Sequence, residues 1–128
     1  MQFHVTQDEI KTKTNYGSLD ISPNDEKGFR PFQLMVASLA GCSASVYRKI
    51  LAKQKVEFDE MTIDADVERT GDDVNKIEKV TLIFKVKGQN LNEKKLQKSL
   101  EIASKNCSMV QSVTGSIEVI EKVEIEEA

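Results

Sequence analysis

One run of this sequence constrains the fold more than any other: residues 32–44 are apolar around almost the whole circumference of a helix. Pro31 precedes the run, and the first turn of a helix is where proline is tolerated best. Beyond Cys42 the pattern becomes amphipathic, with Tyr47 and Leu51 facing inward and basic residues facing out. The pattern therefore predicts one helix of about 22 residues, which would span roughly 33 Å.

A mostly apolar helix of this length needs cover on every side. The chain has 128 residues, which is the size of one domain and leaves few other elements to supply that cover. Packing against the same helix of a second copy would bury the remaining apolar surface. We therefore expect a homodimer with two such helices packed together.

The rest of the chain predicts strands and one further helix. The predicted strands, found from alternating apolar residues, cover residues 3–7, 10–14, 19–21, 61–67, 80–86 and 117–125. Capping chemistry in residues 90–93 begins the second helix. Its apolar stripe consists of Leu96, Leu100, Ala103 and Cys107. We expect the acidic residues 124–127 to fray. This order of elements is typical of an α+β fold, and we treat residues 1–128 as a single domain.

Charge and composition argue against several classes of function. The net charge is −3 and the lysines are interleaved with acidic residues, so the chain offers no footprint for nucleic acid or for an acidic membrane. The longest weakly polar segment, residues 32–42, is shorter than the roughly 18 residues of a membrane span. The first eight residues lack the basic and apolar regions of a signal peptide. We expect a soluble, cytoplasmic protein.

The two cysteines, Cys42 on the long helix and Cys107 at the end of the second one, are the candidate reactive groups. In a reducing compartment both are expected to be free thiols. Cys42 falls on a stripe with Met35, Leu39 and Val46, where cysteine is more often a small buried apolar residue than a nucleophile. The alternative is a pair in which one thiol attacks a peroxide and the other resolves the product. The pattern alone leaves both interpretations open.

Two segments of the chain carry a resemblance to a known family. The first comprises Pro31, residues 32–35, and a small-residue run from Ala37 to Cys42, and the second is Cys107 after the second helix. Together with the order of elements, they resemble the OsmC/Ohr family. The resemblance implies an OsmC-like fold with a long central helix in an intertwined homodimer. It also implies a thiol-dependent peroxidase that reduces organic hydroperoxides in oxidative stress defence, with a dithiol as reductant and no cofactor.

The resemblance further implies roles for four residues. Cys42 would attack the hydroperoxide and become a sulfenic acid, and Cys107 would resolve it as a disulfide. The family's activating arginine normally comes from the N-terminal strands, whereas the first arginine of this chain is Arg30. The family's glutamate directly after the proline is replaced by Phe32, so Gln33 is the polar residue that would orient the peroxide.

A reactive thiolate at Cys42 needs a stabilising positive group. The N-terminus of its own helix lies about 16 Å away, too far for the helix dipole to act. We therefore expect a cationic side chain to be required. Arg30 can fill that role only if the helix begins late or if a partner chain supplies the arginine.

The rival interpretation is a protein that is not an enzyme. The same fold would then bind a small apolar ligand at the dimer interface, and both cysteines would be buried and inert. Other chemistry has little support, because His4 is the only histidine, and two cysteines with one histidine are too few for a four-ligand zinc site. We therefore expect no metal.

Overall fold

The computed structural model describes residues 1–127, which fall into two units, Met1–Ala37 and Ser38–Ala128. Helix α1 (Pro31–Lys53) begins in the first unit and continues into the second. Its first residue is the predicted one, and its 23 residues agree with the predicted length. The expectation of a single domain stays a prediction.

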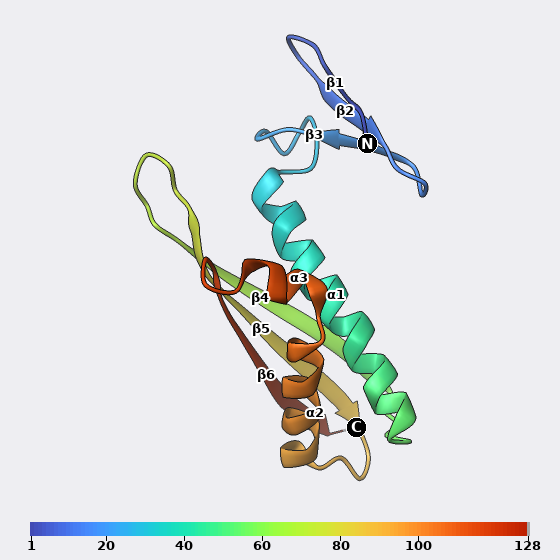
Figure 1. Ribbon diagram of the computed structural model, residues 1–128. Helices are drawn as coiled ribbons and strands as arrows, with labels where there is room; N and C mark the ends of the chain where they lie inside the picture. Colours follow the sequence, from blue (N-terminus) through green and yellow to red (C-terminus); the bar gives the residue numbers. More distant parts are fainter. Residues whose placement is uncertain (128) are drawn as a thin grey trace. The chain divides into compact units, whose positions relative to one another are not determined.

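The first unit is built on a three-stranded antiparallel sheet, which Figure 1 shows in blue. Its strands, all at predicted positions, are β1 (Phe3–Val5), β2 (Ile10–Lys13) and β3 (Ser18–Ile21). Thr12 is its one buried residue, and the Thr12 hydroxyl donates a hydrogen bond of 2.7 Å to the carbonyl of Gln2. No apolar side chain in residues 1–37 is fully buried, so this sheet lacks an apolar core of its own.

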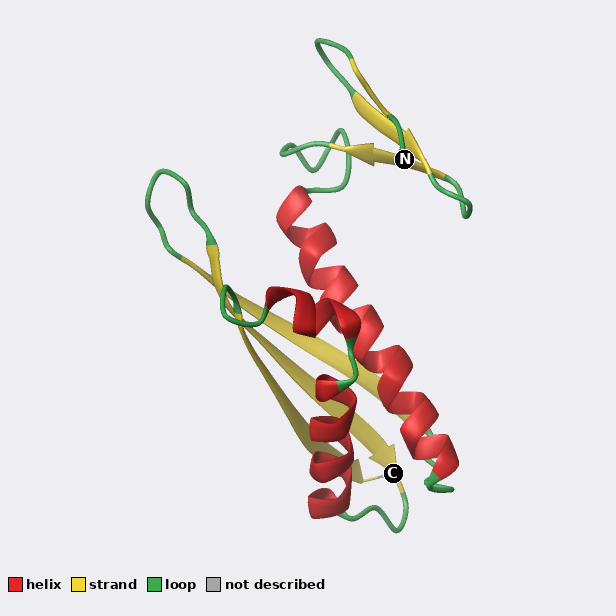
Figure 2. Ribbon diagram, in the orientation of Figure 1, coloured by secondary structure: helices red, strands yellow, loops and turns green. Residues whose placement is uncertain are grey.

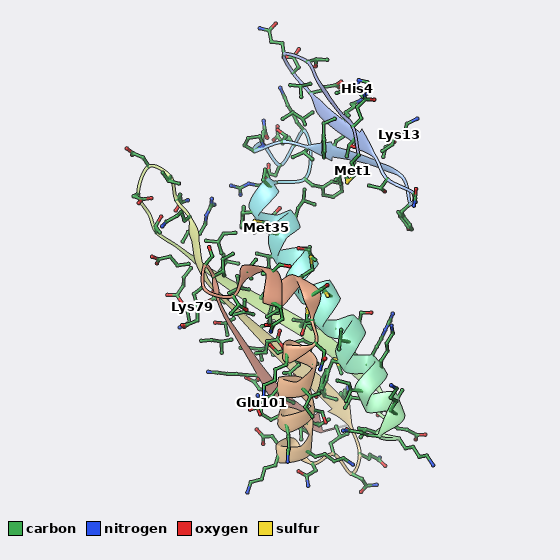
Figure 3. All side chains as sticks on the ribbon, viewed as in Figure 1. Met1, His4, Lys13, Met35, Lys79 and Glu101 are labelled. Carbon is green, nitrogen blue, oxygen red and sulfur yellow. The ribbon has the colours of Figure 1, made fainter. Side chains whose placement is uncertain are left out.

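The second unit contains a mixed three-stranded sheet in the order β4-β5-β6. The predicted hairpin is confirmed, since β4 (Glu60–Arg69) runs antiparallel to β5 (Ile77–Gly88). Strand β6 (Glu118–Glu127) runs parallel to β5. Lys79 on β5, labelled in Figure 3, has its ammonium 3.6 Å from the carboxylate of Glu68 across the hairpin. Cross-strand ion pairs of this kind stabilise the pairing of the two strands on the outer face of the sheet, whereas the inner face is apolar.

The parallel step from β5 to β6 is made by two helices, as a parallel pair requires. These are α2 (Glu93–Lys105) and the short α3 (Ser108–Val113), and Figure 2 shows α2 on the face of the sheet that α1 also covers. The side chain of Asn92 caps α2 as expected, accepting a hydrogen bond of 3.1 Å from the backbone N–H of Lys95.

Tyr47 joins α1 to the other elements of the second unit. This side chain is fully buried, and its ring makes an edge-to-face contact with Phe84 of β5 at a centroid distance of 5.4 Å. Its hydroxyl donates a hydrogen bond of 3.0 Å to the backbone carbonyl of Leu96 on α2. One aromatic residue therefore joins α1 to both the sheet and the second helix. The fully buried apolar neighbours include Leu51, Val80, Leu82, Val86 and Leu100.

Two sequence expectations about these elements were wrong. Residues 124–127 do not fray, because they pair in register with residues 85–88 of the central strand β5. The estimate that no apolar segment reaches membrane-spanning length was also wrong. Helix α1 is long and apolar enough by length and composition, with a mean hydropathy of 1.2 over 18 residues, of which 28% are buried. The core helix of a soluble protein satisfies the same two criteria.

Candidate active site: a thiol pair between α1 and α3

Cys42 lies at the edge of the buried face of α1 and not at its centre. The fully buried positions of the helix are Leu39, Ser43, Tyr47 and Leu51, at steps of one helical turn. The predicted stripe is confirmed at Leu39, but the buried face then shifts by one residue, to Ser43 and Tyr47. Met35, labelled in Figure 3, is 43% exposed, and Cys42 is half-buried. The offset leaves the Cys42 sulfur accessible while its helix stays anchored.

Cys107 lies just beyond α2, as the family resemblance implies, although the predicted apolar stripe extended the helix to this residue. Asn106 closes α2, and its side-chain amide donates a hydrogen bond of 2.8 Å to the carbonyl of Ile102. Cys107 then takes an extended backbone conformation and precedes α3 as its N-cap residue. Its side chain is fully buried, as the stripe with Leu96 and Leu100 predicts. Because the chain turns here, α3 begins next to α1.

The fold brings the two thiols together. Cys42 and Cys107 are free thiols that lie close enough for each to shift the pKa of the other. The backbone N–H of Met109 also donates to the Cys42 sulfur, and the Ser108 hydroxyl lies 3.8 Å from it. Cys42 is thus surrounded by donors from the four-residue stretch that follows α2.

These contacts separate the acidities of the two thiols. The pKa of Cys42 is lowered, first by the Met109 N–H and then by the Cys107 thiol, while burial opposes the shift. The pKa of Cys107 is raised, first by burial and also by its hydrogen bond to Cys42. Cys42 therefore ionises first, and Cys107 remains a protonated donor to the Cys42 thiolate. A thiolate is the nucleophilic form of cysteine, so Cys42 is the better candidate of the two for a nucleophile.

The expectation that Cys42 needs a cationic side chain stays a prediction, because uncharged groups also favour its ionised form. Uncharged donors from Met109, Cys107 and Ser108 lower the Cys42 pKa. Hydrogen bonds to an ionised acceptor are stronger than bonds between neutral groups, so several such donors stabilise a thiolate. The Met109 donor could not be found from the sequence, because a backbone N–H carries no residue-type signal.

Arg30 and Gln33, the other two predicted site residues, lie in the first unit. Because α1 begins at Pro31, the late helix start that would bring Arg30 toward its own Cys42 does not occur. The Arg30 guanidinium instead lies over the ring of Phe32, 4.7 Å from its centroid, and its buried Nε has no hydrogen-bond partner among residues 1–127. Gln33 is exposed on the first turn of α1. Their roles toward Cys42 stay predictions.

A half-buried carboxyl group that contacts the residue next to Cys42 was not anticipated. Glu121 of β6 points to the helix-covered face, where the hydroxyl of Ser43 lies 2.9 and 3.0 Å from its two oxygens. Burial raises the pKa of Glu121, and the Ser43 hydrogen bond partly offsets that effect. Ser43 follows Cys42 directly, so this contact fixes the turn of α1 that carries the thiol. The only sequence signal was a glutamate at an inward-facing position of an alternating strand.

Metal chemistry receives no support from the arrangement of ligands. In the part of the chain that the structure describes, no group of three or more His, Cys, Asp and Glu side chains is placed to hold a metal ion.

The comparisons with known proteins agree with this fold and element order. The family model for OsmC-like protein matches residues 24–122. Because that match spans more than half of the chain, the protein belongs to the OsmC-like family. A sequence comparison with curated proteins gives no match.

Three solved structures illustrate the similarity. A hypothetical protein from Aquifex aeolicus VF5 has a TM-score of 0.86 and 21% identity, over 99% of this chain and 95% of that one. An organic hydroperoxide resistance protein OsmC from Legionella pneumophila has 0.73 and 20%, over 96% and 93%. The organic hydroperoxide resistance protein OhrB of Bacillus subtilis has 0.71 and 20%, over 96% and 95%. At these identities the matches establish the shared OsmC/Ohr fold.

Proposed function

We propose that this protein is a thiol-dependent peroxidase that reduces organic hydroperoxides. The single observation that carries the proposal is the pair of free thiols that the fold brings together and whose pKa values are shifted in opposite directions. A two-cysteine peroxidase needs one thiol that ionises readily to attack and a second thiol close by to resolve the product. The names of the Legionella and Bacillus structures, which refer to organic hydroperoxide resistance, support an organic substrate.

The proposed reaction proceeds in two steps through these thiols. The Cys42 thiolate attacks the distal oxygen of the hydroperoxide, the O–O bond breaks, and the alkoxide leaves and takes a proton to become an alcohol. The sulfur is oxidised to a sulfenic acid. Cys107 then forms an S–S bond to the Cys42 sulfur, the S–O bond breaks, and the oxygen leaves as water with the Cys107 proton. An external dithiol reduces the disulfide and restores both thiols.

The proposed active form is a homodimer. The first unit has no fully buried apolar side chain, and only 28% of the most apolar window of α1 is buried within one chain. Cover from a second copy would supply the missing core, and it would offer a route for a partner's Arg30 to reach Cys42. A stable monomer in sedimentation at low micromolar concentration would contradict this arrangement. We place the protein in the cytoplasm, where free thiols and a dithiol reductant coexist.

The test is titration of the reduced protein with cumene hydroperoxide, followed by intact mass and a thiol count. We expect one equivalent to remove two hydrogen atoms and both thiols, and to yield one equivalent of alcohol. Hydrogen peroxide serves as the comparison oxidant and should react more slowly. An unchanged mass with two intact thiols would reject peroxidase function and favour the rival, in which the fold binds a small apolar ligand.

A further inference from the structure

Among residues 1–127, Ser108 is the one residue whose side-chain hydroxyl hydrogen-bonds to the sulfur of Cys42. It is the first residue of α3, and its Oγ lies 3.8 Å from the Sγ of Cys42. Its backbone carbonyl accepts a hydrogen bond of 2.7 Å from the Ser112 hydroxyl one turn later. The Ser108 hydroxyl itself is directed to Cys42, on the exposed side of the thiol pair.

The other groups around Cys42 explain why a hydroxyl donor at this place affects the ionisation of its thiol. The main groups that favour its ionised form are uncharged donors, and one of them, Cys107, is consumed during the reaction. The Ser108 hydroxyl is not oxidised and does not give up its proton, so it remains available through the whole cycle. A small polar side chain at this position also leaves the exposed side of the sulfur open.

We propose that Ser108 is a catalytic residue of the thiol chemistry, whose hydroxyl donates a hydrogen bond to the Cys42 thiolate and keeps it ionised for attack. This inference rests on the proposed function for its role in turnover. The effect on the thiolate itself is a property of the resting protein and can be measured without any peroxide.

Loss of the Ser108 hydroxyl should change the pH dependence of the Cys42 reaction rate in a way that a purely structural role would not. Removing the donor lowers the thiolate fraction at pH values below the Cys42 pKa, but it makes each remaining thiolate more nucleophilic. With ordinary thiol reactivity, every tenfold loss of thiolate is offset by an about threefold gain in intrinsic rate. The pH–rate profiles of the Ser108→Ala variant and the wild type should therefore cross: the variant reacts more slowly at low pH and faster at high pH.

The experiment compares the pH dependence of iodoacetamide alkylation at Cys42, followed by peptide mass analysis, in four reduced proteins. These are the wild type, Ser108→Ala, Ser108→Thr and Ser112→Ala. Threonine keeps a hydroxyl at position 108 and should restore the wild-type profile. Ser112→Ala is the matched control, because it removes a hydroxyl from the same short helix without touching Cys42. Circular dichroism checks that each variant is folded.

We expect the Ser108→Ala midpoint to move to higher pH with crossing profiles, and the other two variants to follow the wild type. A Ser108→Ala profile that overlays the wild type, or that is lower at every pH with an unchanged midpoint, overturns the role of Ser108. A wild-type protein that does not react with cumene hydroperoxide refutes the proposed peroxidase, and with it the role of Ser108 in turnover. The alkylation profiles still decide whether Ser108 stabilises the thiolate.

Discussion

The hydroxyl of Ser43 hydrogen-bonds to the half-buried carboxyl group of Glu121, with oxygen–oxygen distances of 2.9 and 3.0 Å. Ser43 is itself fully buried on α1, one residue after Cys42. The backbone of the same strand is also held by α2. The side-chain amide of Gln97 donates a hydrogen bond to the Glu121 carbonyl and accepts one from the N–H of Val123. Polar contacts thus fix β6 to both helices around the thiol pair.

Replacing Glu121 with Gln should make the protein more stable at neutral pH than the wild type. The folded-state pKa of Glu121 is raised by burial above the ordinary value of 4.5, so the folded state binds a proton more tightly than the unfolded state. The contribution of the Glu121 carboxyl group to the free energy of unfolding is fully present below pH 4.5 and is lost as the pH rises through the folded-state pKa. Gln keeps an acceptor for Ser43 but does not ionise.

Urea unfolding at a series of pH values, with matched protein concentrations, measures this effect. The free energy of unfolding of Glu121→Gln minus that of the wild type should grow from about pH 4.5 upward and then become constant. Glu118→Gln, at a solvent-exposed position of the same strand, serves as the control and should show no such trend. A difference that does not vary with pH would show that Glu121 titrates alike in both states.

Tyr47→Phe should destabilise the protein by about 1 kcal/mol, because it removes a buried hydrogen bond while keeping the ring packed on Phe84. Thermal or urea unfolding measures the loss. Tyr16→Phe is the matched control, since Tyr16 is fully exposed and its hydroxyl should contribute less than about 0.5 kcal/mol. Equal effects at the two positions would mean that the Leu96 carbonyl contact does not anchor α1.

The elements that depend on apolar periodicity were predictable, and those that depend on local polar contacts were not. Alternation identified the hairpin of β4 and β5, and a four-residue step identified the stripe of α2. The end of α2 was missed because the Asn106 side chain closes it before Cys107. The last strand was expected to fray because it is acidic. Its residues 124–127 instead pair in register with residues 85–88 of β5, where the positive charge of Lys85 attracts the carboxylates of Glu124 and Glu126.

The same distinction applies to the candidate site. The identities of Cys42 and Cys107 followed from residue type and from a family resemblance, and the fold brings them into contact. Ser108, Met109 and Glu121 could not be assigned, because each acts through a backbone group or through a tertiary contact. Ser43 was missed since a polar residue at the centre of a buried stripe is unfavourable until its hydrogen-bond partner is known.

The two thiols should differ in alkylation rate. Near neutral pH, iodoacetamide should modify Cys42 well before Cys107, because the Cys42 pKa is lowered and Cys107 is both raised in pKa and fully buried. Peptide mass analysis over time gives the two rates. Denatured protein is the control, since unfolding should remove the difference. Equal rates in the native protein would contradict the assignment of attacking and resolving thiols.

Removing the resolving thiol should trap the first intermediate. In the Cys107→Ser variant, cumene hydroperoxide should add one oxygen atom to Cys42, and the sulfenic acid reagent dimedone should then label that residue. The serine hydroxyl keeps a hydrogen-bond donor at position 107, so the Cys42 thiolate should still form. In the reciprocal Cys42→Ser variant, the remaining thiol is buried and has a raised pKa, so it should stay unmodified at the same peroxide concentration. Oxidation of Cys42→Ser at the wild-type rate would refute the roles given to both cysteines, because attack would then have to begin at Cys107.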